Sequence, residues 1–141
     1  LHDYRINLAL YCKRNKIADT FGTFDGGSLI PVSESLTHYR FSLIIENNIS
    51  KYWFTEKIMN CFAACTVPIY LGATAIDQYF NTAGIIRIEK MDFSYITGLL
   101  SECTEERYKS MKQAILDNFY RVQSFLSIED YLYLNYSNLF V

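Results

Sequence analysis

Short apolar runs alternate with amphipathic segments along the chain. Residues 41–45 and 67–71 are apolar and rich in β-branched side chains, which is typical of parallel strands buried on both faces. Between them, residues 56–64 are predicted to be helical because Ile58 and Phe62 lie four residues apart on one side. Strand–helix alternation with short connections predicts an α/β fold, a parallel sheet with helices on both faces.

The remaining pattern predicts further elements on both sides of this unit. Helices are expected over residues 3–14, 34–39, 75–80, 93–100, 105–119 and 128–136, and short strands over 17–21 and 85–88. Thr55 and Asp92 are expected to cap the helices that follow them. The sheet would then have about four strands, in a single domain over residues 1–141. Because the chain begins at Leu1 rather than Met, we expect a fragment whose upstream part is missing.

Composition and charge narrow the classes of function. Half of the residues are hydrophobic, which excludes a disordered chain. Lys and Arg number 13 against 15 Asp and Glu, so there is no basic field to hold nucleic acid, and no nucleic-acid partner is expected. The four cysteines show neither Cys-x-x-Cys spacing nor a neighbouring His, so we expect free thiols and no metal site.

Polar residues gather where the first apolar run ends and where the next helix begins. Glu46 and Asn47 follow the strand, and Glu56 and Lys57 open the helix. Open α/β sheets bind ligands beyond the carboxyl ends of their strands, and a helix N-terminus with a nearby cation suits a phosphate. In such a site Glu56 would serve a ribose and Lys57 a phosphate. A Glu-Lys pair is also common on plain helix surfaces, so the residues alone favour a nucleotide or phosphate site without specifying a reaction.

The aromatic pair before this helix has two interpretations. Tyr52 or Trp53 would cover the base of a bound nucleotide, or both would simply be core aromatics.

Four ordered blocks resemble the donor-binding domain of the family 10 glycosyltransferases, the α-1,3/1,4-fucosyltransferases. They are Tyr-Arg-Phe-Ser-Leu at 39–43, Glu46-Asn47, Phe-Thr-Glu-Lys-Ile at 54–58 and Val-Pro-Ile-Tyr-Leu-Gly at 67–72. The resemblance covers roughly residues 3–120. It implies a GT-B architecture of two Rossmann-like domains, of which this chain would be the C-terminal, nucleotide-sugar half.

The resemblance implies an inverting transfer of fucose from GDP-fucose to a sugar hydroxyl of a glycan acceptor, in glycan biosynthesis such as protein glycosylation. The general base of the family lies in the N-terminal domain, so no catalytic residue is expected here and the isolated fragment should be inactive. No Asp-x-Asp motif is present, so neither a metal nor another cofactor is required.

The resemblance also implies roles for individual residues. The donor-binding residues would be Arg5, Asn47, Trp53, Glu56 and Lys57, and further candidates for the donor pocket are Glu46, Tyr52, Thr55 and Asn60. Arg5 and Lys57 would meet the diphosphate and Glu56 the ribose. Trp53 stands where the family often has a tyrosine, and Ile45 where an aromatic residue is frequent. The pocket is therefore expected to be reshaped, or to take a variant donor.

Two other functions remain open at this point. The same fold would accept another nucleotide sugar, or the chain would be a non-catalytic α/β module that binds a partner or a carbohydrate. The expected partners are GDP-fucose, a glycan acceptor held by the missing domain, and a membrane surface touched peripherally by the full-length protein. A bacterial cytoplasmic or inner-membrane-associated location is favoured over the Golgi lumen, because no disulfide framework is visible.

Overall fold

A three-stranded parallel sheet forms the centre of the part of the chain that the computed structural model describes, residues 1–140. The strands β1 (Phe41–Ile45), β2 (Val67–Leu71) and β3 (Ile86–Arg87) lie side by side in that order. Phe41 pairs with Val67 and Ile45 with Leu71, so β1 and β2 end at the same edge of the sheet. Both strands have the bounds that the sequence predicts.

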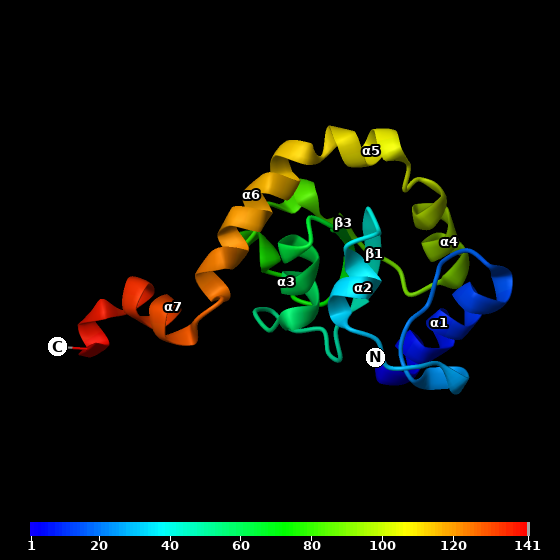
Figure 1. Ribbon diagram of the computed structural model, residues 1–141, viewed down its shortest axis with the longest axis horizontal. Coiled ribbons are helices and arrows are strands. Elements are labelled where there is room, and N and C mark those ends of the chain that lie inside the picture. The colour runs from blue at the N-terminus through cyan, green and yellow to red at the C-terminus, as the bar shows by residue number, and fades with distance from the viewer. Residues whose placement is uncertain (141) are drawn as a thin grey trace.

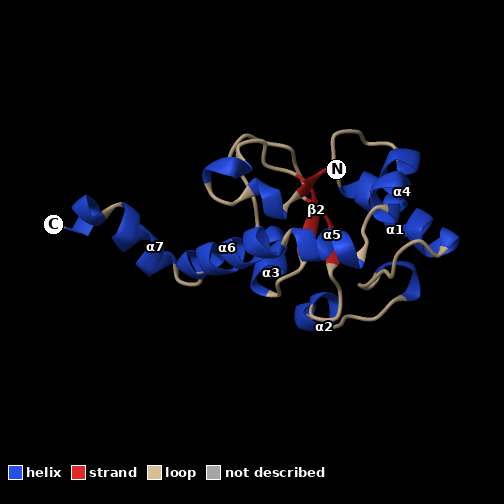
Figure 2. Ribbon diagram, turned by 90° about the horizontal axis from the view of Figure 1, so that it is seen from above, coloured by secondary structure: helices blue, strands red, loops and turns tan. Residues whose placement is uncertain are grey.

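Helices cover both faces of the sheet, as the alternation of its side chains requires. On one face Ile45 and Ile69 pack with Leu8 of α1 (His2–Asn15) and Ile96 of α4 (Phe93–Ser101). On the other face, Tyr70 packs against α3 (Glu56–Ala63) and against the end of α6 (Lys112–Val122). In Figures 1 and 2, α1 and α4 lie to one side of the strands, and α3 and α6 to the other. The α/β prediction with helices on both faces is confirmed.

Shorter elements complete the described chain. They are α2 (Val32–Leu36), α5 (Glu105–Ser110), α7 (Ile128–Asn135) and the 3₁₀ turns η1 (Phe24–Gly26), η2 (Ile76–Gln78), η3 (Thr82–Gly84), η4 (Gln123–Phe125) and η5 (Ser137–Phe140). The predicted helices at 34–39 and 75–80 are therefore a shifted short helix and a 3₁₀ turn. None of the helices within residues 1–140 is long and apolar enough to cross a lipid bilayer.

The strand predicted at residues 17–21 is wrong. This segment is a loop that leaves α1 through Lys16, a residue in the left-handed conformation, and reaches Gly22 at a φ of 119°. Its anchor is a side chain: the Tyr39 hydroxyl donates a hydrogen bond to Asp19 Oδ2 at 2.8 Å. The sheet described here therefore has three strands instead of about four.

The single helix predicted at residues 105–119 is two helices. Thr104 caps α5, and the chain then breaks at Met111, whose N–H is shared between the carbonyls of Arg107 and Tyr108. Before the break, Tyr108 of α5 packs against the first core; after it, α6 runs from the first core, where Ile115 packs, to the second, where Val122 packs.

Candidate functional site

The carboxyl end of β1 carries three consecutive residues that point alternately to the two faces of the sheet. The Ile45 side chain packs with Leu8 of α1 and the Asn47 side chain accepts from Arg5 of α1, whereas Glu46 contacts Thr55 at the start of α3. The Glu46 N–H extends the strand ladder by donating to the carbonyl of Leu71 at 2.9 Å. One strand end therefore organises side chains from two helices that lie on opposite faces.

On the α3 side, Glu46 forms a compact cluster with Thr55 and Lys57. Its carboxylate accepts hydrogen bonds from the Thr55 N–H at 3.0 Å and from the Thr55 hydroxyl at 2.8 Å. The Lys57 ammonium lies 3.6 Å from Glu46 Oε2 and donates to Thr55 Oγ1 at 3.1 Å. Thr55 also caps α3, as predicted, by accepting from the Lys57 N–H.

Gly72 makes room for this cluster. A Cβ on Gly72 would lie 2.3 Å from the Tyr70 hydroxyl and 2.5 Å from Glu46 Cγ, distances that real contacts do not reach. The Tyr70 hydroxyl is held by the Ala73 N–H at 2.9 Å, and burial, with the Glu46 charge as a smaller cause, raises its pKa to about 12. The sequence analysis assigned no role to Tyr70 or Gly72. The sequence signal that could have indicated this crowding is a glycine directly after a buried strand, which often marks a close approach of other groups.

On the α1 side, Arg5 forms hydrogen bonds with the end of β1. Its guanidinium donates to Asn47 Oδ1 at 2.8 Å and to the Ile45 carbonyl at 3.4 Å. His2 Nδ1 lies 3.2 Å from the same guanidinium, a neighbour that the sequence analysis did not anticipate. Arg5 and Lys57 thus contact neighbouring residues of one strand end from opposite faces of the sheet.

Tyr52 and Trp53 lie on an exposed loop before α3, so the alternative that both belong to the core is wrong. Tyr52 is 49% exposed and Trp53 is 68% exposed. Two hydrogen bonds hold the loop in place. Ser50 Oγ accepts from the Trp53 N–H at 2.9 Å, and the Ser50 carbonyl accepts from the Thr74 N–H at 2.9 Å. Exposed aromatic rings on a loop held by hydrogen bonds are suited to stack on a flat ligand such as a nucleobase.

The remaining predicted residues differ in their relation to the cluster. Glu56 is exposed in the first turn of α3, and its Oε1 lies 3.4 Å from the Lys57 ammonium. Asn60 lies one turn further along α3. Within the described residues, no hydrogen bond joins its side chain to Glu46, Thr55 or Lys57, so the structure does not bring it into the cluster.

Metal-binding chemistry has no counterpart in the part of the chain that the structure describes. No group of three or more His, Cys, Asp or Glu residues there is placed to hold a metal ion. Cys12, Cys61, Cys65 and Cys103 are free thiols, and burial raises the pKa of Cys61 to about 12, which keeps it protonated and unreactive at neutral pH.

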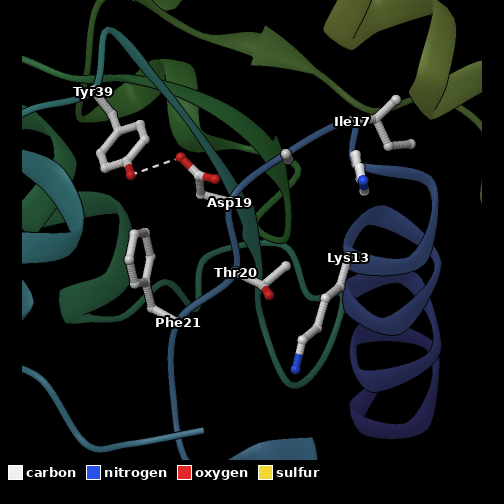
Figure 3. A pocket seen from close by; sticks show the side chains of 8 residues that line it. Lys13, Ile17, Asp19, Thr20, Phe21 and Tyr39 are labelled. Atoms are coloured by element: carbon white, nitrogen blue, oxygen red, sulfur yellow. Dashed lines mark hydrogen bonds between the residues drawn. The ribbon is translucent and has the colours of Figure 1, made fainter.

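A separate cavity of about 840 Å³ lies at the opposite end of α1 and β1 (Figure 3). Lys13, Asp19, Phe21 and Tyr39 line it, and Tyr39 comes just before β1 begins. It is therefore on the amino-terminal side of the strands, away from the Glu46 cluster. The Lys13 ammonium is already paired with Asp25 Oδ2 at 2.9 Å, and this partner lowers the pKa of the Asp25 carboxyl.

Comparison with known proteins gives one family. The model of the C-terminal part of glycosyltransferase family 10 (fucosyltransferase) matches residues 12–106, which include the Glu46 cluster and the aromatic loop but not Arg5. An α-(1,3)-fucosyltransferase of Helicobacter pylori is 32% identical over 56 residues, covering 40% of this chain and 12% of that protein. An α-(1,4)-fucosyltransferase of Arabidopsis thaliana is 33% identical over 52 residues, covering 37% of this chain and 13% of that protein.

Two solved structures share the fold. A crystal structure of an α1,3-fucosyltransferase with GDP has a TM-score of 0.59 and 22% identity, over 88% of this chain and 45% of that one. A second α1,3-fucosyltransferase structure has a TM-score of 0.58 and 23% identity, over 86% of this chain and 41% of that one. The chain thus spans less than half the length of the solved chains that it matches.

Proposed function

The chain belongs to glycosyltransferase family 10, the fucosyltransferases, and on that premise we propose that it is the donor-binding part of an inverting fucosyltransferase. The whole enzyme would transfer fucose from GDP-fucose to a hydroxyl of a glycan acceptor. The fold is the α/β fold of the GT-B fucosyltransferases. We assign acceptor binding to the half of such enzymes that has no counterpart in this chain. Peripheral membrane contact of the whole enzyme is an expectation that follows from the family.

The observation that carries this proposal is the pair of cations at the end of β1. Arg5 arrives from α1 and Lys57 from the first turn of α3, and both are tied to consecutive residues of the strand end. A nucleoside diphosphate is an anion that needs such donors together with the free N–H groups of a helix N-terminus. The Lys57 side chain is 29% exposed and Arg5 is half-buried, so both side chains keep some contact with solvent.

Residues near the same end of β1 would contact the ribose and the base of the nucleotide. The exposed Glu56 carboxylate would accept hydrogen bonds from the two ribose hydroxyls. Trp53 or Tyr52 would cover the guanine, a flat surface that suits an aromatic ring. The choice of GDP is supported by the solved relative whose crystal structure is described as containing GDP.

The chemistry follows from the charges that this chain supplies. As the acceptor oxygen bonds to C1 of fucose, the bond from C1 to the β-phosphate oxygen breaks and the configuration inverts. Negative charge grows on the departing GDP, where Arg5 and Lys57 would stabilise it. A carboxylate from the acceptor-binding half would remove the proton of the acceptor hydroxyl. Because two side-chain cations offset the charge of the diphosphate, the proposal requires no metal or other cofactor.

Calorimetric titration of the chain with GDP and with UDP tests this function. GDP should bind more tightly than UDP, and Lys57→Ala should weaken GDP binding by roughly 1.5–3 kcal/mol, the contribution of one charge-assisted hydrogen bond. Lys109→Ala, which removes an exposed lysine of α5 near the amino-terminal end of β1, where Arg40 pairs with Glu105, should leave the affinity unchanged. Chelation of divalent metals should not alter the titration.

The same titration separates the two alternatives. Equal or tighter binding of UDP would favour a different nucleotide sugar as donor. A folded chain that binds neither nucleotide would contradict the proposed function and favour a non-catalytic module.

A further inference from the structure

We propose that Glu46 is a positioning residue for the donor: through Thr55 it holds the Lys57 ammonium where the diphosphate arrives. This inference rests on the proposed function, because it assigns Lys57 to a phosphate. The sequence analysis placed Glu46 among the residues of the donor pocket itself. The structure gives it a different place, behind the residues that a donor would touch.

Burial excludes direct contact between Glu46 and a donor. Its side chain is 0% exposed, so a ligand on the surface has no access to the carboxylate. Removing a carboxylate from water is unfavourable in free energy unless the carboxylate is paired with a cation and hydrogen-bonded. The polar partners that the structure gives it are the Thr55 N–H, the Thr55 hydroxyl and the Lys57 ammonium. The carboxylate therefore affects a bound donor only indirectly, through the residues at the start of α3 that it contacts.

The contacts of the Lys57 ammonium are numerous but long. It lies 3.1 Å from Thr55 Oγ1, 3.4 Å from Glu56 Oε1 and 3.6 Å from Glu46 Oε2. Strong charge-assisted hydrogen bonds between nitrogen and oxygen are about 2.7–2.9 Å long. The ammonium is thus oriented by three oxygens without being saturated by any one of them. This arrangement leaves it able to donate to a phosphate that approaches from its exposed side.

Thr55 is the link between the buried carboxylate and the lysine. Its hydroxyl donates its proton to Glu46 Oε2, so its lone pairs are left for the N–H and the ammonium of Lys57. Without the Glu46 carboxylate, the Thr55 hydroxyl would lose the acceptor that fixes its rotation. The Lys57 side chain would then lose a defined partner and sample more rotamers before GDP binds.

A purely structural Glu46 would behave differently. It would tie α3 to β1 and affect the free energy of unfolding, but its effect on GDP binding would not depend on Lys57. Its negative charge also lies near the proposed phosphate position, so removing that charge without any loss of positioning would strengthen GDP binding. The positioning role therefore predicts the opposite sign.

The test is a double-mutant cycle in the intact chain, with GDP as the titrated ligand. Glu46→Gln keeps the size of the side chain and can still accept from the Thr55 N–H, while the charge is lost. It should raise the Kd for GDP about three- to tenfold when Lys57 is present, and less than about twofold in a Lys57→Ala background. Glu106→Gln, at an exposed carboxylate of α5, is the matched control and should change neither Kd.

A second variant keeps the test decisive if Glu46→Gln does not fold. Thr55→Val preserves the shape of the side chain but removes the hydroxyl that donates to Glu46 Oε2 and caps α3, while the Thr55 N–H and the Lys57 ammonium remain as partners of the carboxylate. It should weaken GDP binding in the same Lys57-dependent way. Folded variants that bind GDP as well as the unmodified chain, or that weaken it equally in both backgrounds, would overturn the positioning role. In that case the unmodified chain still binds GDP and the proposed function stands. A chain that fails to bind GDP at all contradicts the proposed function instead.

Discussion

At the scale of single residues, the ends of β1 and β2 are crowded around Gly72. Its φ is not positive, so the need for glycine here is steric and does not arise from the backbone conformation. The Tyr70 ring and the Glu46 side chain occupy the space that a Cβ would need. Both neighbours are buried, with the Tyr70 hydroxyl and the Glu46 carboxylate fixed by hydrogen bonds, so neither can move away cheaply.

Gly72→Ala should therefore lower the free energy of unfolding by about 1–3 kcal/mol, the usual cost of overpacking a core. Gly98→Ala is the matched control, because a Cβ at Gly98 meets nothing within 4 Å. Gly98 is inside α4, where alanine is favoured over glycine by roughly 0.5–1 kcal/mol, so this variant should gain stability. Urea denaturation measures both, and equal effects of the two substitutions would show that crowding at Gly72 is absent.

At the scale of elements, side-chain caps mark where two of the helices that cover the sheet, α3 and α4, begin. Thr55 caps α3, and Asp92 Oδ1 accepts from the Tyr95 N–H at 2.8 Å to cap α4. Each cap satisfies a backbone donor that the helix itself leaves without a partner. This explains why the sequence predicts the starts of α3 and α4 at the residues where the structure has them.

Replacing the second cap tests its contribution to the fold. Asp92→Ala should reduce the free energy of unfolding by about 0.5–2 kcal/mol, as loss of an N-cap does elsewhere. Asp92→Asn retains a side-chain oxygen for the Tyr95 N–H and should lose much less. Guanidinium denaturation of the three proteins provides the comparison, and an alanine variant as stable as the asparagine variant would show that this cap contributes little.

At the scale of the whole molecule, two cores on opposite faces of the sheet hold the chain together, and no residue of α7 whose side chain is described belongs to either. In Figure 1, α7 extends away from the sheet beyond α6. It contacts η4, where Tyr131 stacks on Phe125 at a ring-centroid distance of 5.0 Å. Leu134, on α7, is 71% exposed, so its side chain adds little buried apolar area.

A chain that ends at Ser127 should consequently remain folded and bind GDP like the longer chain. The expected loss in the free energy of unfolding is about 0.5–1.5 kcal/mol, the range for one aromatic pair beyond its buried area. Thermal unfolding and the GDP titration check the two parts of this expectation. Loss of a cooperative transition on truncation would mean that α7 supports the cores after all.

Local sequence signals are enough to predict several elements of this fold. The apolar runs of β1 and β2, the Thr55 cap and the Asp92 cap each act over a few residues, so the pattern predicts these elements and their order. The parallel sheet covered on both faces follows from that order. The polar residues around the end of β1 could be collected as a candidate site because the carboxyl ends of parallel strands meet at one edge.

Features that depend on partners far apart in the sequence could not be predicted from local patterns. A strand exists only with a neighbour to complete its ladder, so residues 17–21 became a loop despite their apolar pattern. The contact of Arg5 with Asn47 joins residues 42 positions apart, and no local pattern encodes it. Glu46, behind the proposed site, is buried, whereas Trp53 is exposed. This difference depends on the packing of the whole chain, which determines the side chains that stay in contact with solvent.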